Sequence, residues 1–312
     1  MWFWAPALLL VGAVALKDTS GVVIPTALKK PLDVAEALEN KVSGLVAAGA
    51  FVPIIASVFG SDAVKEAVVG NPMLASLGVS GIFNILMVPF AIIAFCVVWL
   101  AAHAINMLIL ISPFGTVDAG LKAFRTFLLS TVTITGFANP MVGLVWSLII
   151  IVVSYFLAGW AFRLTVCGTQ FIWDYFTFGR MRFKPDAKGN AMFLAREIIK
   201  VTIRTYGTLA RNDAGELVFT YRPWLLLAPR TLTLPKGNYA VGKGIFHSEI
   251  VTVNGEEQTA VFTLPPRYNS HEEALAKIYG WGAVVDIGLL GGLKAFFGAI
   301  KELCGFGAKA AV

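Results

Sequence analysis

Four polar side chains interrupt long apolar runs of the sequence and are the first candidates for chemistry: Asn84, His103, Asn106 and Thr133. Polar groups at membrane depth mark solute or proton paths by default, because hydrocarbon solvates them poorly. Neutral amides, imidazoles and hydroxyls also form hydrogen bonds between membrane helices or with their own backbone. No carboxylate accompanies them within the same run, so the structural interpretation is favoured over a path for solutes.

A second set of candidates combines cations with an amphipathic aromatic residue in the polar part of the chain: Arg204, Arg211, Arg222, Trp224, Arg230, Lys236 and Lys243. Anionic headgroups attract such a surface at about 1 kcal/mol per nearby Lys or Arg. The set therefore indicates a lipid-binding or partner-binding face. A solvated basic surface explains the same residues equally well.

The sequence carries no motif of a known catalytic site. It has no P-loop, no Gly-x-Ser-x-Gly, no His-Glu-x-x-His and no dinucleotide-binding fingerprint. His247 and His271 lack metal-ligand spacing, and Cys96, Cys167 and Cys304 form no Cys-x-x-Cys pair. We therefore expect a non-enzymatic protein with no metal and no cofactor.

Composition places the chain in a membrane. Of its 312 residues 57% are hydrophobic and only 14% are charged, with a mean hydropathy of +0.75, whereas about a quarter of the residues in soluble domains are charged. Residues 1–179 balance their charges, and 180–280 hold fourteen Lys/Arg against nine Asp/Glu. The excess of cations favours membrane lipid as a partner. Nucleic acid is the weaker interpretation, and we expect no nucleic-acid partner, because no binding motif accompanies the charge.

The apolar runs predict an α-helical polytopic membrane protein with about five spans: Trp2–Leu16, Val42–Gly60, Gly81–Ala102, Leu121–Phe137 and Met141–Phe162. Leu121–Phe137 spans only if Lys122 and Arg125 snorkel. Asn-Pro-Met occurs at 71 and again at 139, where asparagine can cap a helix that proline begins. A duplicated helical hairpin and chance recurrence of a common turn both explain this repeat.

The change in composition along the chain predicts three parts. They are a transmembrane domain over 1–179, a β-rich barrel-like domain over 180–280, and an amphipathic interfacial helix with its tail over 281–312. Turn signals separate β-rich segments at 201–209, 217–221, 225–234, 245–253 and 259–264. Ser270 and Glu273 predict a capping box for a helix over 271–279.

Cations cluster in alternate loops: at Lys17 to Lys41, at Lys122 and Arg125, and from Arg163 to Lys184. Under the positive-inside rule this pattern places the N-terminus outside and the C-terminal domain in the cytoplasm.

Four segments carry a family resemblance: Trp4-Ala5-Pro6, Ile24-Pro25 through Ala47-Ala48-Gly49-Ala50, Ser112-Pro113-Phe114 through Arg125, and Asn139-Pro140 through Arg163. Over roughly its first half, the chain resembles a bacterial integral membrane family catalogued as domain of unknown function 4126. The resemblance implies a helical fold of the bacterial inner membrane and no assigned activity. The strands of the C-terminal part are similar in shape to pleckstrin-homology-like barrels.

These observations predict a membrane scaffold or an accessory subunit of a membrane complex or homo-oligomer, which presents a basic cytoplasmic domain to anionic lipids or a protein partner. The alternative is a small-solute or ion transporter that uses the polar residues of the helical bundle.

Overall fold

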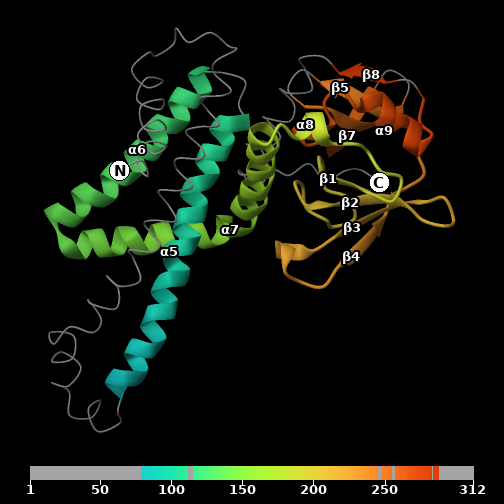
Figure 1. Ribbon diagram of the computed structural model, residues 1–312. Coiled ribbons are helices and arrows are strands. Elements are labelled where there is room, and N and C mark those ends of the chain that lie inside the picture. The colour runs from blue at the N-terminus through green and yellow to red at the C-terminus, as the bar shows by residue number, and fades with distance from the viewer. Residues whose placement is uncertain (1–78, 112–114, 245–246, 255–256, 283, 288–312) are drawn as a thin grey trace, which may run out of the picture. The chain divides into compact units, whose positions relative to one another are not determined.

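A computed structural model describes residues 79–111, 115–244, 247–254, 257–282 and 284–287 (Figure 1). The chain divides into two compact units, and the division falls inside one helix, α7 (Pro140–Phe176). We call Met1–Leu110 with Thr116–Ala161 the helical unit. The sheet unit consists of Ile111–Gly115 and Phe162–Val312.

The first described helix, α5 (Val79–Ile111), is 33 residues long and contains Pro89. Its apolar part runs over Pro89–Leu110 and is long enough to cross a membrane. The expected span over 81–102 thus begins and ends several residues later. This shift places His103 and Asn106 inside the candidate span, and not at its end.

Helix α6 (Gly115–Ala138) and α7 meet at the predicted Asn139-Pro140 break. The backbone N–H of Met141 donates to Asn139 Oδ1 at 2.9 Å, and Pro140 occupies the first helical position. Proline fits there because this position needs no backbone donor. The prediction that asparagine caps and proline begins this helix is confirmed.

Helix α7 has 37 residues, which corresponds to about 55 Å of helix at about 1.5 Å per residue. A bilayer core needs only about 20 residues. The helix therefore exceeds the requirement for one crossing by about half its length. Large apolar side chains up to Phe156, which is 79% exposed, cover its first part.

The prediction of a five-span polytopic helical protein is wrong. Within the described residues α5 and α7 are long and apolar enough to cross a membrane, and the chain continues into an eight-stranded sheet. Helix α6, which contains the expected span Leu121–Phe137, does not qualify. The reason is its mixed composition: Asp118, Lys122 and Arg125 lie in its first half and hydroxyl residues follow.

The sheet has the order β4-β3-β2-β1-β7-β6-β5-β8. Its strands are β1 (Asn190–Leu194), β2 (Tyr206–Arg211), β3 (Leu217–Tyr221), β4 (Arg230–Thr233), β5 (Tyr239–Gly244), β6 (Glu249–Asn254), β7 (Glu257–Thr263) and β8 (Val285–Ile287). Neighbours are antiparallel except β5 and β8. Short helices α8 (Gly179–Arg182) and α9 (Glu272–Tyr279) complete the unit with the 3₁₀ turns η3 (Pro223–Leu225) and η4 (Pro266–Tyr268).

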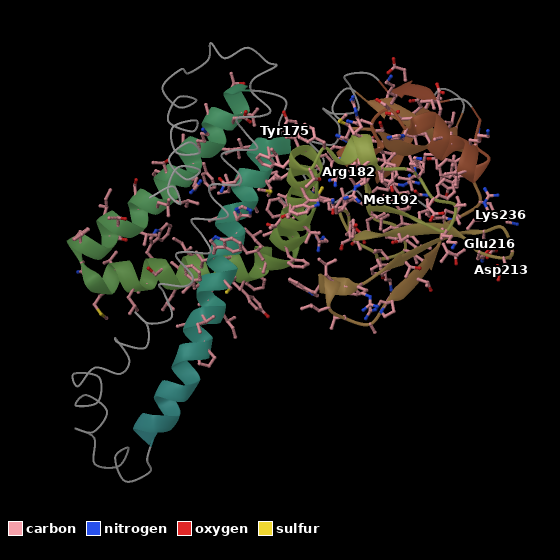
Figure 2. The ribbon with its side chains drawn as sticks, in the orientation of Figure 1. Tyr175, Arg182, Met192, Asp213, Glu216 and Lys236 are labelled. Atoms are coloured by element: carbon pink, nitrogen blue, oxygen red, sulfur yellow. The ribbon has the colours of Figure 1, made fainter. Side chains whose placement is uncertain are left out.

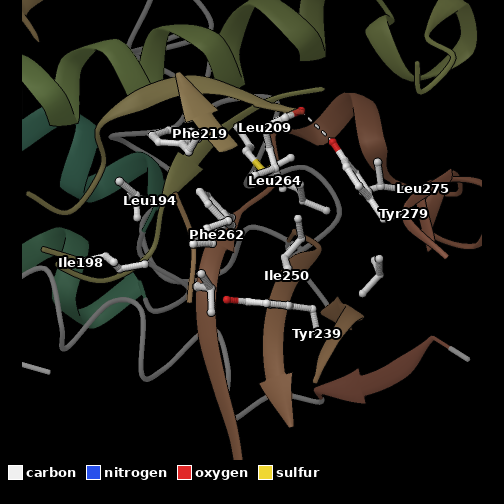
Figure 3. Close-up of a cluster of buried hydrophobic side chains, with 14 of the residues drawn as sticks. Leu194, Ile198, Leu209, Phe219, Tyr239, Ile250, Phe262, Leu264, Leu275 and Tyr279 are labelled. Carbon is white, nitrogen blue, oxygen red and sulfur yellow. Dashed lines mark hydrogen bonds between the residues drawn. The ribbon is translucent and has the colours of Figure 1, made fainter. Parts of the chain in front are cut away.

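One apolar core joins strands from both halves of the sheet to α9 (Figure 3). Phe219 and Phe262 lie in it with Leu275 of α9. The Tyr279 hydroxyl donates to the Leu209 carbonyl at 2.8 Å and accepts from Asn190 Nδ2 at 2.9 Å. Burial raises the pKa of Tyr279 to about 12 and also raises the pKa of Tyr268, because both phenolates would lack solvent.

Sequence patterns located some elements of the sheet unit and missed others. The segment 217–221 coincides with β3, whereas β1, β5 and β8 were not predicted. Helix α9 is present, but no side-chain hydrogen bond caps it, so the predicted capping box is wrong. The amphipathic helix expected within 281–312 is also contradicted where Val285–Ile287 forms β8.

Several predictions fall outside the described residues. They are the spans over 2–16 and 42–60, the Asn-Pro-Met copy at 71, Cys304 and the tail over 288–312.

Candidate membrane-interface site

The second half of α7, Phe162–Phe176, belongs to the sheet unit, and we call it the stem. Its buried residues are Leu164, Cys167, Gly168, Ile172 and Asp174, which lie on one side of the helix. This spacing gives one continuous buried stripe. The stem is therefore packed on one side against its own unit.

A buried ion pair fixes the stem to the sheet. Arg267, in η4, donates from Nε and Nη2 to the two carboxylate oxygens of Asp174 at 2.8 and 2.7 Å. The backbone N–H of Arg267 and the Gln170 amide also donate to this carboxylate, at 3.2 and 2.8 Å. Only 2% of the Asp174 side chain is exposed. Two-point Arg–carboxylate geometry restricts both position and orientation, so the pair acts as a clamp.

The start of the stem touches two loops of the sheet unit. Arg163 Nε donates to the Ile203 carbonyl at 2.9 Å, and the Phe162 and Trp224 rings lie 4.9 Å apart. Arg163 is the first charge after the uncharged run that begins at Pro140. The sheet unit is thus attached where the apolar helix first becomes polar.

Sheet topology explains why these two loops lie together. Phe193 of β1 pairs with Tyr206 of β2, and Tyr221 of β3 pairs with both Gly207 and Arg230. The β1–β2 connection (195–205) and the β3–β4 connection (222–229) therefore emerge from the same end of the sheet, which we call the loop end. The β2–β3 turn (212–216) marks the opposite turn end.

The β3–β4 connection is an exposed apolar loop. It reads Arg222-Pro223-Trp224-Leu225-Leu226-Leu227-Ala228-Pro229-Arg230, and Leu226 is 88% exposed. Trp224 and Leu225 have φ values of 54° and 60°, which bulky residues seldom adopt. Trp224 is partly covered by Phe162, whereas Leu226 at the tip of the loop is almost fully exposed.

The β1–β2 connection has a similar tip. Ile199 and Lys200 have φ values of 46° and 66°, in a tight turn closed by reciprocal backbone hydrogen bonds between Ile198 and Val201. Ile199 is 71% exposed. A β-branched residue at positive φ is strained and persists only where its surroundings enforce it. Both loops therefore hold apolar side chains outward at the loop end.

The predicted basic set does not form one face. Arg204, Arg222, Trp224 and Arg230 lie at the loop end, where Arg204 precedes β2 and its N–H donates to the Leu194 carbonyl. Arg211 lies at the turn end, where its guanidinium donates to the Tyr279 carbonyl.

The two lysines of the set lie elsewhere. Lys243 is opposite Asp286 in the β5–β8 pairing. Lys236 follows β4, whose Thr233 pairs with Val218 of β3 near the turn end. Figure 2 shows Lys236 on the same side of the sheet unit as Asp213 and Glu216 of the β2–β3 turn.

The four intramembrane candidates are also divided. His103 and Asn106 are buried on one side of α5, where His103 stacks on Trp99 and Asn106 accepts from Arg125 Nη1 at 2.8 Å. Asn84 lies near the start of the same helix. Thr133 is exposed on α6 and bonds to the Leu129 carbonyl, as expected for a structural hydroxyl.

Sequence reasoning missed the clamp and the apolar tip. Asp174 and Arg267 are 93 residues apart, so no local pattern connects them. The run Leu225–Leu227 was included in an expected strand over 225–234, but the strand begins only at Arg230. Pro223 and Pro229 on either side were the available signal, because proline disfavours a central strand.

Comparison with known proteins gives no further guide, since no protein-family model, curated protein or solved structure matches the chain.

Proposed function

We propose that the protein is a non-enzymatic membrane scaffold or accessory subunit, in which α7 anchors the sheet unit and holds its loop end against anionic lipid headgroups. The observation that carries this proposal is the continuity of α7. Its first half is an exposed apolar helix of bilayer length, and its second half is clamped to the sheet by Asp174 and Arg267. The stem belongs to the same helix as the exposed apolar half, so no Gly/Ser-rich flexible linker separates the apolar helix from the clamp.

We also propose the cytoplasmic leaflet of a bacterial inner membrane as the location of the sheet unit. Arg163, Arg180, Arg182 and Lys184 follow the uncharged run of α7. Cations flanking a span favour the cytoplasmic side. A protein partner in a membrane complex can occupy the same basic end, since arginine and tryptophan are enriched where protein interfaces are strongest.

Lipid retained by the purified full chain tests this proposal. The chain is extracted in mild detergent, and its bound phospholipids are quantified against the source membrane. We expect anionic lipids to be enriched for the wild type and for Lys188→Gln/Lys236→Gln, a matched pair of neutralised lysines near the turn end. Arg222→Gln/Arg230→Gln should remove the enrichment. Equal lipid profiles for the two double variants would refute the proposal.

A small-solute or ion path is the second candidate, favoured by one observation. His103 and Asn106 are buried within a candidate span, and Arg125 of α6 reaches Asn106. Charged and polar groups at that depth commonly line paths. Flux through the reconstituted protein that His103→Ala abolishes and Thr133→Ala leaves unchanged would establish this function. Flux indifferent to both variants would remove it.

A further inference from the structure

We propose that the β3–β4 loop, 222–230, inserts its tip Trp224–Leu227 into the acyl boundary of the same leaflet from which α7 emerges. The tip then forms a membrane contact in addition to that of α7. This inference rests on the proposed function for its membrane setting and adds the mode of contact.

The composition of the loop is that of an interfacial insertion. Four successive large apolar residues, Trp224 to Leu227, lie between two prolines and two arginines. All four are substantially exposed, from 42% for Leu225 to 88% for Leu226. Water would solvate such a cluster poorly, and a contiguous exposed apolar patch marks an interaction surface.

The position of the loop selects the bilayer as its occupant. Trp224 packs on Phe162, which follows the exposed apolar part of α7 and precedes its first charge, Arg163. A helix that crosses the hydrocarbon places that first charge at the headgroup level. Because Trp224 contacts Phe162, which directly precedes Arg163, the β3–β4 loop lies at the same membrane depth as Arg163. Tryptophan favours this level, where its ring meets acyl chains and its N–H meets water.

The flanks of the loop match a headgroup layer. Arg222 and Arg230 are both exposed and lie at the base of the loop, where Arg230 pairs with Tyr221 and Arg222 follows Tyr221. Long cationic side chains extend to lipid phosphates while the residues between them enter the apolar layer. The β1–β2 loop repeats this arrangement, with exposed Ile199 beside exposed Lys200. Two loops of the same sheet end therefore present an apolar tip with adjacent cations.

Backbone geometry supports a preformed contact. Positive φ at Trp224 and Leu225 is maintained although neither residue is glycine. Strained backbone of this kind clusters at functional sites, where it holds side chains ready for a ligand.

Site-directed fluorescence on the full chain tests the insertion. Cys96 and Cys304 are replaced by Ser and buried Cys167 by Ala, and Leu226→Cys is labelled with a polarity-sensitive fluorophore. Asp213→Cys, exposed at the turn end, is the matched control. Both proteins are placed in nanodiscs of neutral phosphatidylcholine and in nanodiscs containing phosphatidylglycerol. Quenching is measured with aqueous iodide and with nitroxide attached to the acyl chains.

We expect a blue-shifted emission at 226, quenching by the acyl-chain nitroxide, and several-fold weaker iodide quenching than at 213. The label on Ile199→Cys should behave in the same way but at a shallower depth. Iodide access at 226 equal to that at 213 would overturn the inference. Shielding from both quenchers would overturn it too, because protein would then cover the tip.

The two proposals fail differently. If the wild type retains no excess of anionic lipid, but acyl-chain nitroxide still quenches the label at 226 in neutral nanodiscs, headgroup selectivity is rejected and the insertion stands. Intact enrichment with an iodide-accessible Leu226→Cys label rejects the insertion alone.

Discussion

The two halves of α7 belong to one apolar helix and differ in burial. Up to Ala161 the helix exposes most of its large side chains, including Val152 and Phe156. From Phe162 onward it buries a stripe that ends in the carboxylate of Asp174. The first half thus exposes apolar side chains such as Phe156, whereas the second half buries the charged side chain of Asp174.

This contrast shows that apolar run length does not locate a bilayer crossing. The whole segment Met141–Phe176 is apolar enough to qualify as a span. The sheet unit distinguishes the two halves of this segment. It packs along Phe162–Phe176, and a polar sheet unit cannot enter hydrocarbon. The first half alone has the length that a bilayer core requires.

Breaking the clamp should have the largest effect. Arg267→Met leaves the Asp174 carboxylate buried without its charge partner, so we expect the free energy of unfolding of the sheet unit to fall by about 3–5 kcal/mol. Denaturant titration of the full chain in detergent, followed by tryptophan fluorescence, measures this change.

The double variant Asp174→Leu/Arg267→Met separates a buried charge from lost packing. It should recover most of the stability, since replacing both members of a buried pair leaves no unpaired charge. Asp213→Asn, an exposed change at the turn end, should stay within about 0.5 kcal/mol of the wild type. A single Arg267→Met variant as stable as this control would show that the pair does not hold the stem.

A charge introduced into each half tests where the bilayer lies. Val152→Arg, in the exposed first half, should cost about 2.5–3.5 kcal/mol of insertion free energy if it lies near the membrane centre. Thr169→Arg, exposed on the stem, should cost much less because its side chain is near water. Translocon insertion assays of α7 report both values. Equal costs would place the stem inside the hydrocarbon and break the comparison.

The sequence predicted features that depend on neighbouring residues. Asn139-Pro140 begins α7 because capping and a missing donor are local properties. The segment 217–221 forms β3, and 272–279 forms α9 within the expected helix. Elements and contacts that depend on distant partners were not predictable from local pattern.

The failures share this physical origin. The strand β1 pairs with β2 and β7, which lie on either side of it in the sheet and far from each other in sequence. The leucines at 225–227 have strand composition, yet they lie beyond the last β3–β4 pair, Tyr221 with Arg230, and form an exposed loop.

Alkaline pH should destabilise the sheet unit, which contains Tyr279 and the second half of α7. The Tyr279 pKa of about 12 exceeds the usual value of about 10. The unfolded chain loses this proton first, so the stabilising effect is complete below pH 10 and decreases by about 1.4 kcal/mol per pH unit until about pH 12. Tyr279→Phe should lower the free energy of unfolding at neutral pH by about 1 kcal/mol per lost hydrogen bond. It should also make the decrease of this free energy between pH 10 and 12 less steep. Denaturant midpoints at pH 8 to 12 measure this, and identical slopes would contradict it.

The smallest expected effect concerns the beginning of the exposed half. Asn139 accepts from the backbone N–H of Met141, so Asn139→Ala should cost the helical unit about 1 kcal/mol. Asn139→Asp retains the acceptor and adds a negative charge near the positive end of the helix dipole, so it should keep the wild-type stability. Thermal unfolding of the full chain in detergent, followed by helical circular dichroism, compares the variants. If Ala and Asp variants melt together, the cap does not stabilise the exposed half, and its stability comes from the surrounding lipid or detergent alone.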